Sequence, residues 1–311
     1  MNAPGTRLRV AHPYLLLALA PFFWACNWIV GRALANDVPP MAMTLLRWVF
    51  ALIILTPFAA PHVAREWRIV RANWKAMLVL GALGVGTHNA LAYLGLNYTT
   101  ATNGVILNSF IPVMIIACSW LFLRERLSAL QLAGVVVSLT GVLAILSRGN
   151  PEVLASFRLN KGDLFVILSM AMWSIYTIGL RWRPAGLHML TFLFALIVVG
   201  IVCVLPFFIA EFTWGRRMTP SIANFAALAA LGLFPSLLGY IFWNRGVEQV
   251  GASVAGLFAH LMPVFGVILA WIFLGERLAL FHVTGIALIL TGIWITSRLG
   301  RRPVPVPAGT D

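Results

Sequence analysis

The stretch that decides the fold is Pro112-Val-Met-Ile-Ile-Ala-Cys-Ser-Trp-Leu-Phe-Leu-Arg-Glu-Arg-Leu127, because it returns as Pro263-Val-Phe-Gly-Val-Ile-Leu-Ala-Trp-Ile-Phe-Leu-Gly-Glu-Arg-Leu278. Matched residues are 151 positions apart, so that Glu125 pairs with Glu276. A repeat of about half the chain, inside a very apolar sequence, is typical of duplicated membrane bundles, and many transporters are built in this way. The pattern therefore bears on both fold and function.

The composition is that of an integral membrane protein. Of the 311 residues, 61% are apolar and 10% are charged, whereas soluble domains carry about 25% charged residues. Asp, Glu, Lys and Arg are absent from long stretches, each close to the roughly 20 residues that a spanning helix needs. We predict an all-α integral membrane protein with ten transmembrane helices, at 13–31, 40–60, 74–96, 101–123, 128–147, 162–181, 188–210, 221–244, 251–274 and 279–298.

The predicted spans divide into two halves of five. Because five is odd, the second half must lie upside down in the membrane relative to the first, which makes the halves inverted repeats with a substrate site expected near the bilayer midplane. The match extends to Gly81 and Gly232 at the same offset, and to Trp24 and Trp173 at an offset of 149. The predicted units are 1–148 for the first repeat, 149–161 for a polar linker, and 162–311 for the second repeat with its basic C-terminal tail.

The net charge of +13 would favour a nucleic-acid partner in a soluble protein. Here basic loops flanking membrane spans explain it, so no nucleic-acid partner is predicted. Fourteen Lys and Arg residues fall on the side of the N-terminus and seven on the other side. This asymmetry predicts that both termini are cytoplasmic. We expect residues 1–31 to be retained as the first span, and we expect a monomer to suffice because one chain holds both repeats.

The sequence gives no pattern for catalysis or for a metal. Cys26, Cys118 and Cys203 all fall in predicted spans, and their spacing fits neither a disulfide nor a metal site. Paired carboxylates, a His cluster and a Ser beside a base are also missing. We therefore predict no metal, no cofactor and no enzymatic activity, and a membrane-embedded enzyme is the least favoured class.

Two five-helix halves, each with Pro, an apolar run, a Glu-Arg-Leu turn and a Gly-bearing last helix, resemble the drug/metabolite transporter superfamily, specifically its ten-helix EamA-type exporters. The resemblance covers nearly the whole chain and is not specific for a substrate. Trp24, His88 and Trp173 make the chain most similar to the bacterial aromatic amino-acid exporters. The resemblance implies a bacterial inner-membrane transporter that exports small apolar metabolites, above all aromatic and other hydrophobic amino acids, by alternating access around a central cavity.

Aromatic and polar residues at mid-depth mark the candidate substrate site. Trp24 and Trp173 lie near the middle of their spans, whereas Trp74 and Trp182 flank spans as interfacial tryptophans do. Intramembrane His and Asn are costly unless they meet partners or water, so interhelical hydrogen bonds and core packing are the alternative roles. The candidate substrate-binding residues are Trp24, Asn27, His88, Asn89, Tyr93, Trp173, Tyr176, Tyr240, Trp243 and Asn244.

Arg47 is the only charge well inside a predicted span. It lies about 10 Å from the start of its helix, so snorkelling to the headgroups and a role as counter-charge for a carboxylate or as an outer gate all stay open. Proton-coupled pumps typically use membrane-embedded acids, and no Asp or Glu falls in the middle of a span. We therefore predict transport without obligatory proton coupling, with His88 as the only candidate for titration.

Pro112 and Pro263 occupy matching positions within predicted spans, where proline removes a backbone hydrogen bond and bends the helix. We predict that both act as hinges, and a static kink is the alternative. Nearby, His260 faces Ser109 in the repeat and is predicted to be a satisfied packing residue. Because Asn and Tyr would equally serve nucleobases, nucleosides or sugar derivatives, export of those compounds is the alternative function.

Overall fold

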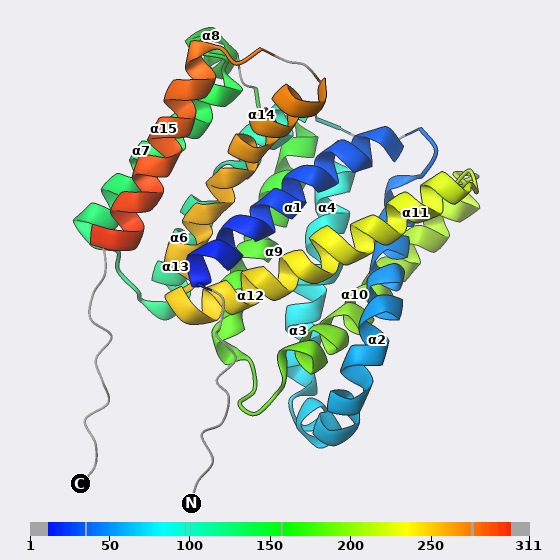
Figure 1. Cartoon of the computed structure of the whole chain (residues 1–311). Coiled ribbons are helices and arrows are strands. Elements are labelled where there is room, and N and C mark those ends of the chain that lie inside the picture. Colours follow the sequence, from blue (N-terminus) through cyan, green and yellow to red (C-terminus); the bar gives the residue numbers. More distant parts are fainter. Residues whose placement is uncertain are drawn as a thin grey trace, which may run out of the picture.

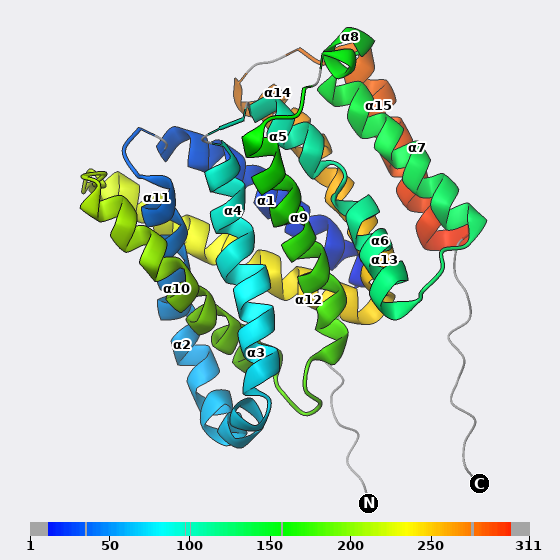
Figure 2. The same cartoon turned by 180° about the vertical axis from the view of Figure 1, so that it is seen from behind.

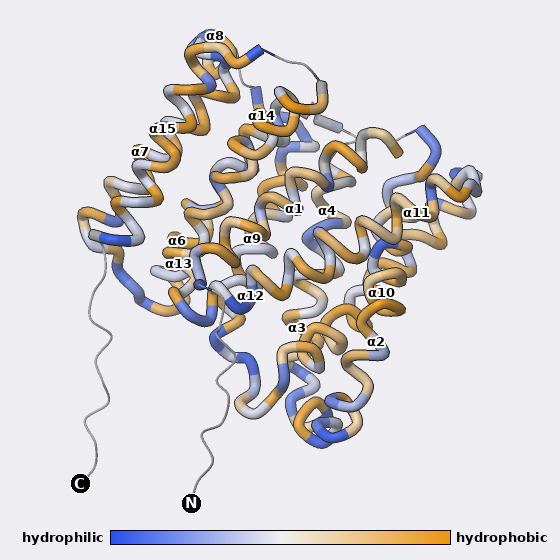
Figure 3. Tube along the Cα trace, viewed as in Figure 1, coloured by the Kyte–Doolittle hydropathy of each residue, from blue (hydrophilic) through white to orange (hydrophobic). Residues whose placement is uncertain are grey.

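The chain is a bundle of helices. The computed structural model describes residues 12–34, 36–96, 98–99, 101–156, 158–274 and 277–299, which form helices and turns and no strand. Within this described part, eight helices are long and apolar enough to cross a membrane, and the apolar helix Ile111–Leu123 is shorter. Apolar residues run along the helices and hydrophilic ones gather at the turns (Figure 3). The protein is therefore built as an all-helical membrane protein.

The helices are bounded as follows: α1 Pro13–Leu34, α2 Pro40–Ala72, α3 Trp74–Gly81, η1 Ala82–Thr87, α4 His88–Leu96, α5 Ala101–Asn108, α6 Ile111–Leu123, α7 Ala129–Leu146, α8 Pro151–Ala155, α9 Lys161–Gly179, η2 Leu180–Trp182, α10 Met189–Thr213, α11 Ile222–Leu231, η3 Gly232–Leu238, α12 Gly239–Val250, α13 Ala252–Leu257, η4 Phe258–His260, α14 Leu261–Leu274, α15 Leu280–Trp294 and η5 Ile295–Leu299.

The helices α7 and α15 pair on one side of the bundle and α2 and α10 on the other, with α1, α4, α9 and α12 between them (Figures 1 and 2). The start of α1, the end of α15, the α2–α3 turn and the loop before α10 lie at one end, the lower end of Figure 1. The short helix α8, inside the predicted linker, lies at the opposite, upper end.

The helix that carries the predicted span 40–60 is longer than that span. In the structure α2 continues to Ala72, which gives a helix about 50 Å long against a hydrocarbon core of about 30 Å. Pro57 and Pro61 lie inside the helix without ending it. The charged residues that follow Pro61 continue the helix, because Arg and Glu are good helix formers. The basic last turns of α2 therefore extend past the apolar part of the bundle.

The mid-helix placement of Pro112 is wrong. Helix α5 ends at Asn108, and Pro112 is the second residue of α6, while Pro263 falls in the first turn of α14 after the 3-10 turn η4. In the first turn of α6 proline removes no intrahelical bond, because that N–H would have no partner in any case, whereas Pro263 follows a segment that is helical from Ala252 onward. Each of these spans is thus interrupted just before its proline, and any hinge lies in the interruption.

The two interruptions contact each other. The Nε2 of His260 lies 2.9 Å from the carbonyl oxygen of Ser109, and its Nδ1 lies 2.7 Å from the hydroxyl of Ser138. Both ring nitrogens of His260 therefore have partners in the interior, which fits the predicted packing role. Ser109 and His260 are 151 residues apart, so positions that match in the repeat meet in space.

Irregular turns also recur at this offset. The π-helix η1 (Ala82–Thr87) in the third helical segment is matched by the π-helix η3 (Gly232–Leu238) in the eighth. Fewer than about 1% of residues in proteins are in π-helices, and π-turns are frequent at functional sites. The recurrence at almost the same offset places equivalent defects in the two halves of the chain, next to the candidate residues on α4 and α12.

Glycines hold α7 against α15 at a close backbone contact. A Cβ on Gly141 would lie 2.6 Å from the carbonyl oxygen of Gly285, and a side chain on Gly292 would collide with the carbonyl oxygen of Gly134. At the offset of 151, Gly134 matches Gly285 and Gly141 matches Gly292. The repeat therefore maps the contact of Gly141 with Gly285 onto the contact of Gly292 with Gly134, which is the reciprocal pattern that a two-fold relation produces.

The pair α2 and α10 is held by reciprocal carboxylates. Glu211, near the end of α10, accepts hydrogen bonds from the backbone N–H groups of Met41 and Ala42 at the start of α2, at 3.0 and 2.9 Å. Glu66, near the end of α2, accepts one from the backbone N–H of His188, the N-cap of α10, at 2.9 Å. A carboxylate stabilises the first turn of a helix because that turn carries unpaired N–H groups and positive potential.

Candidate functional site

The predicted aromatic residues form one cluster in the middle of the bundle. Trp24 on α1 lies edge-on to Trp173 on α9, with ring centroids 5.3 Å apart and planes at 87°. Tyr240 and Trp243 on α12 lie 5.4 and 5.8 Å from Trp173, and Tyr176 lies 5.3 Å from it. Such edge-to-face and tilted contacts are the arrangements that aromatic rings prefer. Trp173 is thus the ring that joins the others.

Arg47 on α2 lies inside the bundle, and only 4% of its surface is exposed. Its Nη1 donates to the amide oxygen of Asn27 at 3.2 Å, and its Nη2 to that of Asn89 at 3.0 Å. The guanidinium carbon lies 5.1 Å from the ring centre of Trp48. Among the described residues no carboxylate pairs with it. The geometry rules out snorkelling and leaves a buried cation held by neutral groups.

His88 and Tyr176 each fix one side of the cluster through hydrogen bonds. The Nδ1 of His88 lies 3.0 Å from the carbonyl oxygen of Ser169 and 2.9 Å from its hydroxyl, and the His88 ring stacks obliquely on Trp173 at 5.0 Å. The hydroxyl of Tyr176 donates to the amide oxygen of Asn244 at 2.9 Å. These contacts connect α4 to α9 and α9 to α12.

The π-helices contribute backbone acceptors to the same cluster. Tyr240 donates its hydroxyl to the carbonyl oxygen of Gly84 in η1 at 2.6 Å, and Trp24 donates its indole N–H to that of Pro235 in η3 at 3.2 Å. A π-turn frees carbonyl groups from the regular i−4 ladder. The irregular turns therefore orient two aromatic side chains of the candidate site.

The structure brings together nine of the ten candidate substrate-binding residues, because the side chain of Tyr93 on α4 lies outside its described part. Six tryptophans expected to flank the spans are each more than half exposed, whereas Trp173 and Trp243 are buried. The six are Trp67, Trp74, Trp120, Trp182, Trp214 and Trp271.

Sequence reasoning missed three members of the cluster. Trp48 is fully buried and lies edge-on to Tyr240 at 5.0 Å. Ser169 bonds His88, and Thr177 accepts from the indole of Trp243 at 3.4 Å. Ser169 and Thr177 stand four residues before and after Trp173, so the helical spacing could have found them. For Trp48, the only feature of the sequence that pointed to the cluster was its position next to Arg47.

The rings contact one another, so a substrate would have to separate them. Several buried polar atoms beside them have no hydrogen-bond partner among the described residues: the Nε of Arg47 and the side-chain amide nitrogens of Asn89 and Asn244. Each such donor costs about 1–3 kcal/mol while it stays unpaired in the interior. The cluster therefore offers unused donors, one of them cationic, next to apolar ring faces.

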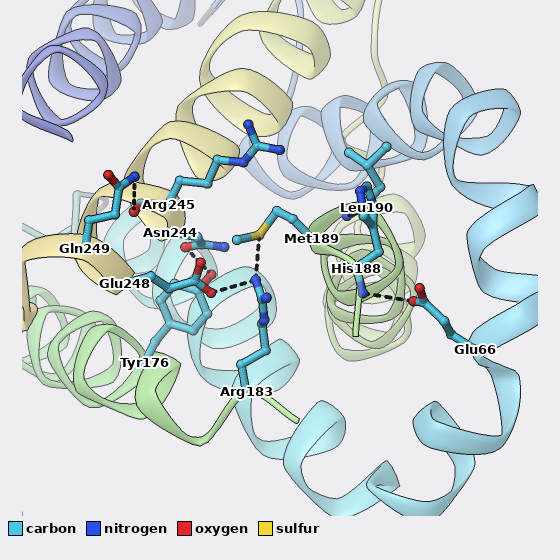
Figure 4. A network of polar contacts seen from close by, with 10 residues as sticks. All are labelled: Glu66, Tyr176, Arg183, His188, Met189, Leu190, Asn244, Arg245, Glu248 and Gln249. Carbon is cyan, nitrogen blue, oxygen red and sulfur yellow. Dashed lines mark hydrogen bonds and ion pairs between the residues drawn. The ribbon is translucent and has the colours of Figure 1, made fainter. Parts of the chain in front are cut away.

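A pocket of about 330 Å³ opens at the lower end. Arg183 and Glu248 form an ion pair of 2.6 Å across it. Tyr176 and Asn244 lie next to this pair, which places the pocket beside the aromatic cluster (Figure 4). The pocket is lined by Glu66, Arg183, Leu187, His188, Met189, Arg245 and Glu248, together with Gly186.

Two stacked imidazoles stand at the rim of this pocket. The rings of His62 on α2 and His188 are parallel within 5°, with centroids 3.9 Å apart. Burial and the neighbouring His62 lower the pKa of His188 below its ordinary value of 6.5. The contact therefore favours the neutral form of His188. Protonation of His188 would weaken the stacking of the two rings.

The buried acids lie at the ends of helices. Asp163 is fully buried at the upper end of α9, where its carboxylate accepts from the hydroxyl of Thr99 at 2.5 Å and from the backbone N–H of Asn160 at 2.8 Å. Glu211 is engaged by the start of α2. Both carboxylates hold helix ends together, and neither touches the aromatic cluster. No group of three or more metal-binding side chains occurs in the described ranges.

Apolar helices of membrane-crossing length around a buried polar and aromatic centre define a helical membrane transporter. Comparison with known families gives the same class. The model of the EamA-like transporter family matches residues 12–147 and 160–298, so the chain belongs to that family. The resemblance to EamA-type exporters found in the sequence is confirmed.

Relatives extend over almost the full length of the chain. The transporter YetK of Bacillus subtilis, itself uncharacterized, is 25% identical over 96% of this chain and 90% of its own length. Protein PecM of Dickeya dadantii is 25% identical over 89% of each chain. A protein of Streptantibioticus cattleyicolor named a probable terminal-alkyne amino-acid exporter is 25% identical over 92% of this chain and 94% of its own. A crystal structure with 19% identity matches with a TM-score of 0.78 over 93% of this chain and 98% of that one, which shows the same fold.

Proposed function

We propose that the protein exports small, largely apolar amino acids, aromatic ones foremost, by alternating access around the central cluster. The observation that carries this proposal is Arg47, a buried guanidinium held only by neutral groups among the described residues. A buried cation without a counter-charge costs several kcal/mol. The carboxylate of a bound amino acid would supply the missing charge, and the rings beside it would take the apolar side chain.

The choice of an amino acid over the alternative substrates rests on charge. Nucleobases, nucleosides and sugar derivatives are mostly neutral, so they would leave Arg47 without a counter-charge. A relative of S. cattleyicolor carries the name of an amino-acid exporter, which supports the same substrate class. The acids at the helix ends, Asp163 and Glu211, are already engaged, which supports transport without obligatory proton coupling.

We further propose ten spans in two inverted repeats, 1–148 and 162–311, joined by the linker 149–161. The reciprocal glycine contacts of α7 and α15, the matching π-helices and the contact of Ser109 with His260 support this symmetry. The two ranges matched by the family model leave out 148–159, which overlaps the linker.

We place the lower end in the cytoplasm of a bacterial cell, with both termini on that side of the inner membrane, because the basic last turns of α2 and the loop before α10 lie there. Export then requires the rings to part and the cluster to open towards the upper end. The interruptions before Pro112 and Pro263 are the hinges we propose, since their backbone lacks a regular helical ladder.

The test is exchange transport by the purified protein in liposomes. Phenylalanine on one side should accelerate the movement of labelled phenylalanine from the other, with and without a protonophore, whereas phenethylamine and uridine should not. The control variant Arg181→Gln should exchange phenylalanine as the wild-type protein does, because Arg181 pairs with Glu125 on the surface. Exchange of uridine without phenylalanine would contradict the substrate class, and collapse with the protonophore would contradict passive transport.

A further inference from the structure

We propose that the pocket at the lower end is a separate loading site, which binds an α-amino acid as its zwitterion before the substrate reaches the central cluster. This proposal rests on the proposed export of amino acids. The volume of about 330 Å³ falls at the small end of the range for ligand sites, about 300–1,000 Å³.

The charges of the pocket balance in number, and one of its arginines is left without an ion pair. Two arginines and two glutamates line it. Glu66 is engaged at the start of α10, and Arg183 pairs with Glu248. Arg245 forms no ion pair within the described ranges. A pocket with both signs and no net charge attracts neither free cations nor free anions strongly, and it suits a molecule that carries both charges.

Arg245 and Glu248 stand three residues apart on α12, so their side chains project from the same face. An α-amino acid bears its carboxylate and ammonium on one carbon. The carboxylate would meet Arg245, and the ammonium would share Glu248 with Arg183. Leu187 and Met189, both buried, supply an apolar wall for the side chain. The pocket thus holds the three features that identify an apolar amino acid.

The pocket also leads towards the central cluster. Asn244 precedes Glu248 by one helical turn and accepts from the hydroxyl of Tyr176, and its amide nitrogen has no partner in the described part of the chain. Figure 4 shows Tyr176 beside the Arg183–Glu248 pair. A substrate that leaves Arg245 would therefore meet an unpaired donor next, at the edge of the aromatic rings.

Two sites per chain can be counted with a fluorine label. We expect 4-fluorophenylalanine to give two bound ¹⁹F NMR signals with the full-length protein in detergent. Arg245→Gln and Glu248→Gln should each remove one signal, and Arg47→Leu should remove the other. Arg181→Gln, which removes a surface arginine outside the pocket, should leave both signals.

The outcomes separate the two proposals. A single bound signal that disappears in Arg47→Leu and persists in both pocket variants would overturn the loading site and leave the central site standing. Loss of both signals in Arg245→Gln, with its melting temperature unchanged, would mean one shared site and would also overturn it. No bound signal with the wild-type protein would remove the amino-acid function and the loading site together.

Discussion

The two halves of the chain share their packing residues but differ in the side chains that face the centre. The carbonyl group of Arg47 lies against Gly232 in the second half, and that of Leu196 lies against the matching Gly81 in the first. Arg47 and Leu196 are therefore equivalent, at the offset of 149 that also relates Trp24 to Trp173. In the proposed inverted repeat the scaffold is symmetric, whereas its buried charge is not.

The residues around the guanidinium of Arg47 also differ between the two halves. Asn27 and Asn89, which hold Arg47, correspond to Tyr176 and Tyr240 in the second half. The first half thus contributes the cation and two amides, and the second contributes two phenol rings and the amide of Asn244. A symmetric scaffold can rearrange between two mirrored states, while an asymmetric centre suits a substrate with one charged and one apolar end.

The largest expected effect comes from Arg47→Leu, which gives the first half the residue of the second. Loss of one partner of a buried charge pair costs about 3–5 kcal/mol, so transport of phenylalanine at low concentration should fall at least 100-fold. The substrate-free protein should melt at the same or a higher temperature, because an unpaired buried charge is removed. Transport assays and thermal melts of one preparation test both. A lower melting temperature with normal transport would make Arg47 structural.

Of the two central tryptophans, the one that contacts more rings should lose more phenylalanine affinity when it is replaced by alanine. Trp173→Ala should weaken phenylalanine binding more than Trp24→Ala, within a range of about 1–3 kcal/mol or about 5- to 150-fold. Among the described side chains, Trp173 meets five other rings and Trp24 meets three. Trp74→Ala and Trp182→Ala, both on the surface, are the controls for titrations by ligand-induced stabilisation. Equal effects at all four positions would reduce the cluster to packing.

Repeat-related glycines should respond alike, if the symmetry of the scaffold is real. Gly141→Ala and Gly292→Ala each force a Cβ into the opposite helix, so each should lower stability by about 1–3 kcal/mol. Gly266→Ala is the matched control, since a Cβ there meets nothing within 4 Å. Thermal melts would measure the three. Strongly unequal losses at Gly141 and Gly292 would contradict the two-fold relation of α7 and α15.

The smallest effect concerns pH and is confined to one half. His188, the N-cap of α10, corresponds to Pro39 before α2, and only His188 titrates. Because its pKa in the folded protein is lowered from 6.5, the folded form binds fewer protons than the unfolded one. Stability should be complete above about pH 6.5 and decline as the pH falls through the lowered pKa.

A pH series of melting temperatures checks this. The nearby charges of Glu66, Arg183 and Arg245, and the ring of His62, act on the same group. The variant His188→Asn keeps a good N-cap and removes the titration, so its decline below pH 6.5 should be shallower. If the melting temperature of the wild-type protein falls below pH 6.5 no more steeply than that of the variant, the stacked imidazoles are not the cause of the decline.

Much of the fold followed from the sequence because apolar runs and the repeat report directly on buried helices. The span predicted at 74–96 has the bounds of the α3–η1–α4 segment, and those at 128–147 and 162–181 end within a residue of the helices. The extension of α2 to Ala72 was missed because charged residues continue a helix as readily as they end one. The interruption at Ser109 was missed because proline marks a first turn as well as a kink.

Most residues of the central cluster were named from the sequence, whereas the contacts between them were not, and their role in substrate binding stays a prediction. Positions that correspond in the two halves and lie near the middle of their spans pointed to the rings and amides that the structure gathers around Trp173. Contacts between distant segments, such as Trp48 with Tyr240 or Ser169 with His88, depend on how helices cross, which no local pattern encodes. The inward position of Arg47 could not be told from snorkelling for the same reason, since depth in a helix does not fix which face it occupies.

The most direct measurement compares two ligands in two proteins. Phenylalanine and phenethylamine differ only in the carboxylate, so the ratio of their dissociation constants isolates that group. We predict a ratio of at least 100 in favour of phenylalanine at the central site of the wild-type protein and a ratio near one at that site in Arg47→Leu. The same ratio in both proteins would contradict the account, because the carboxylate would then bind without the buried guanidinium.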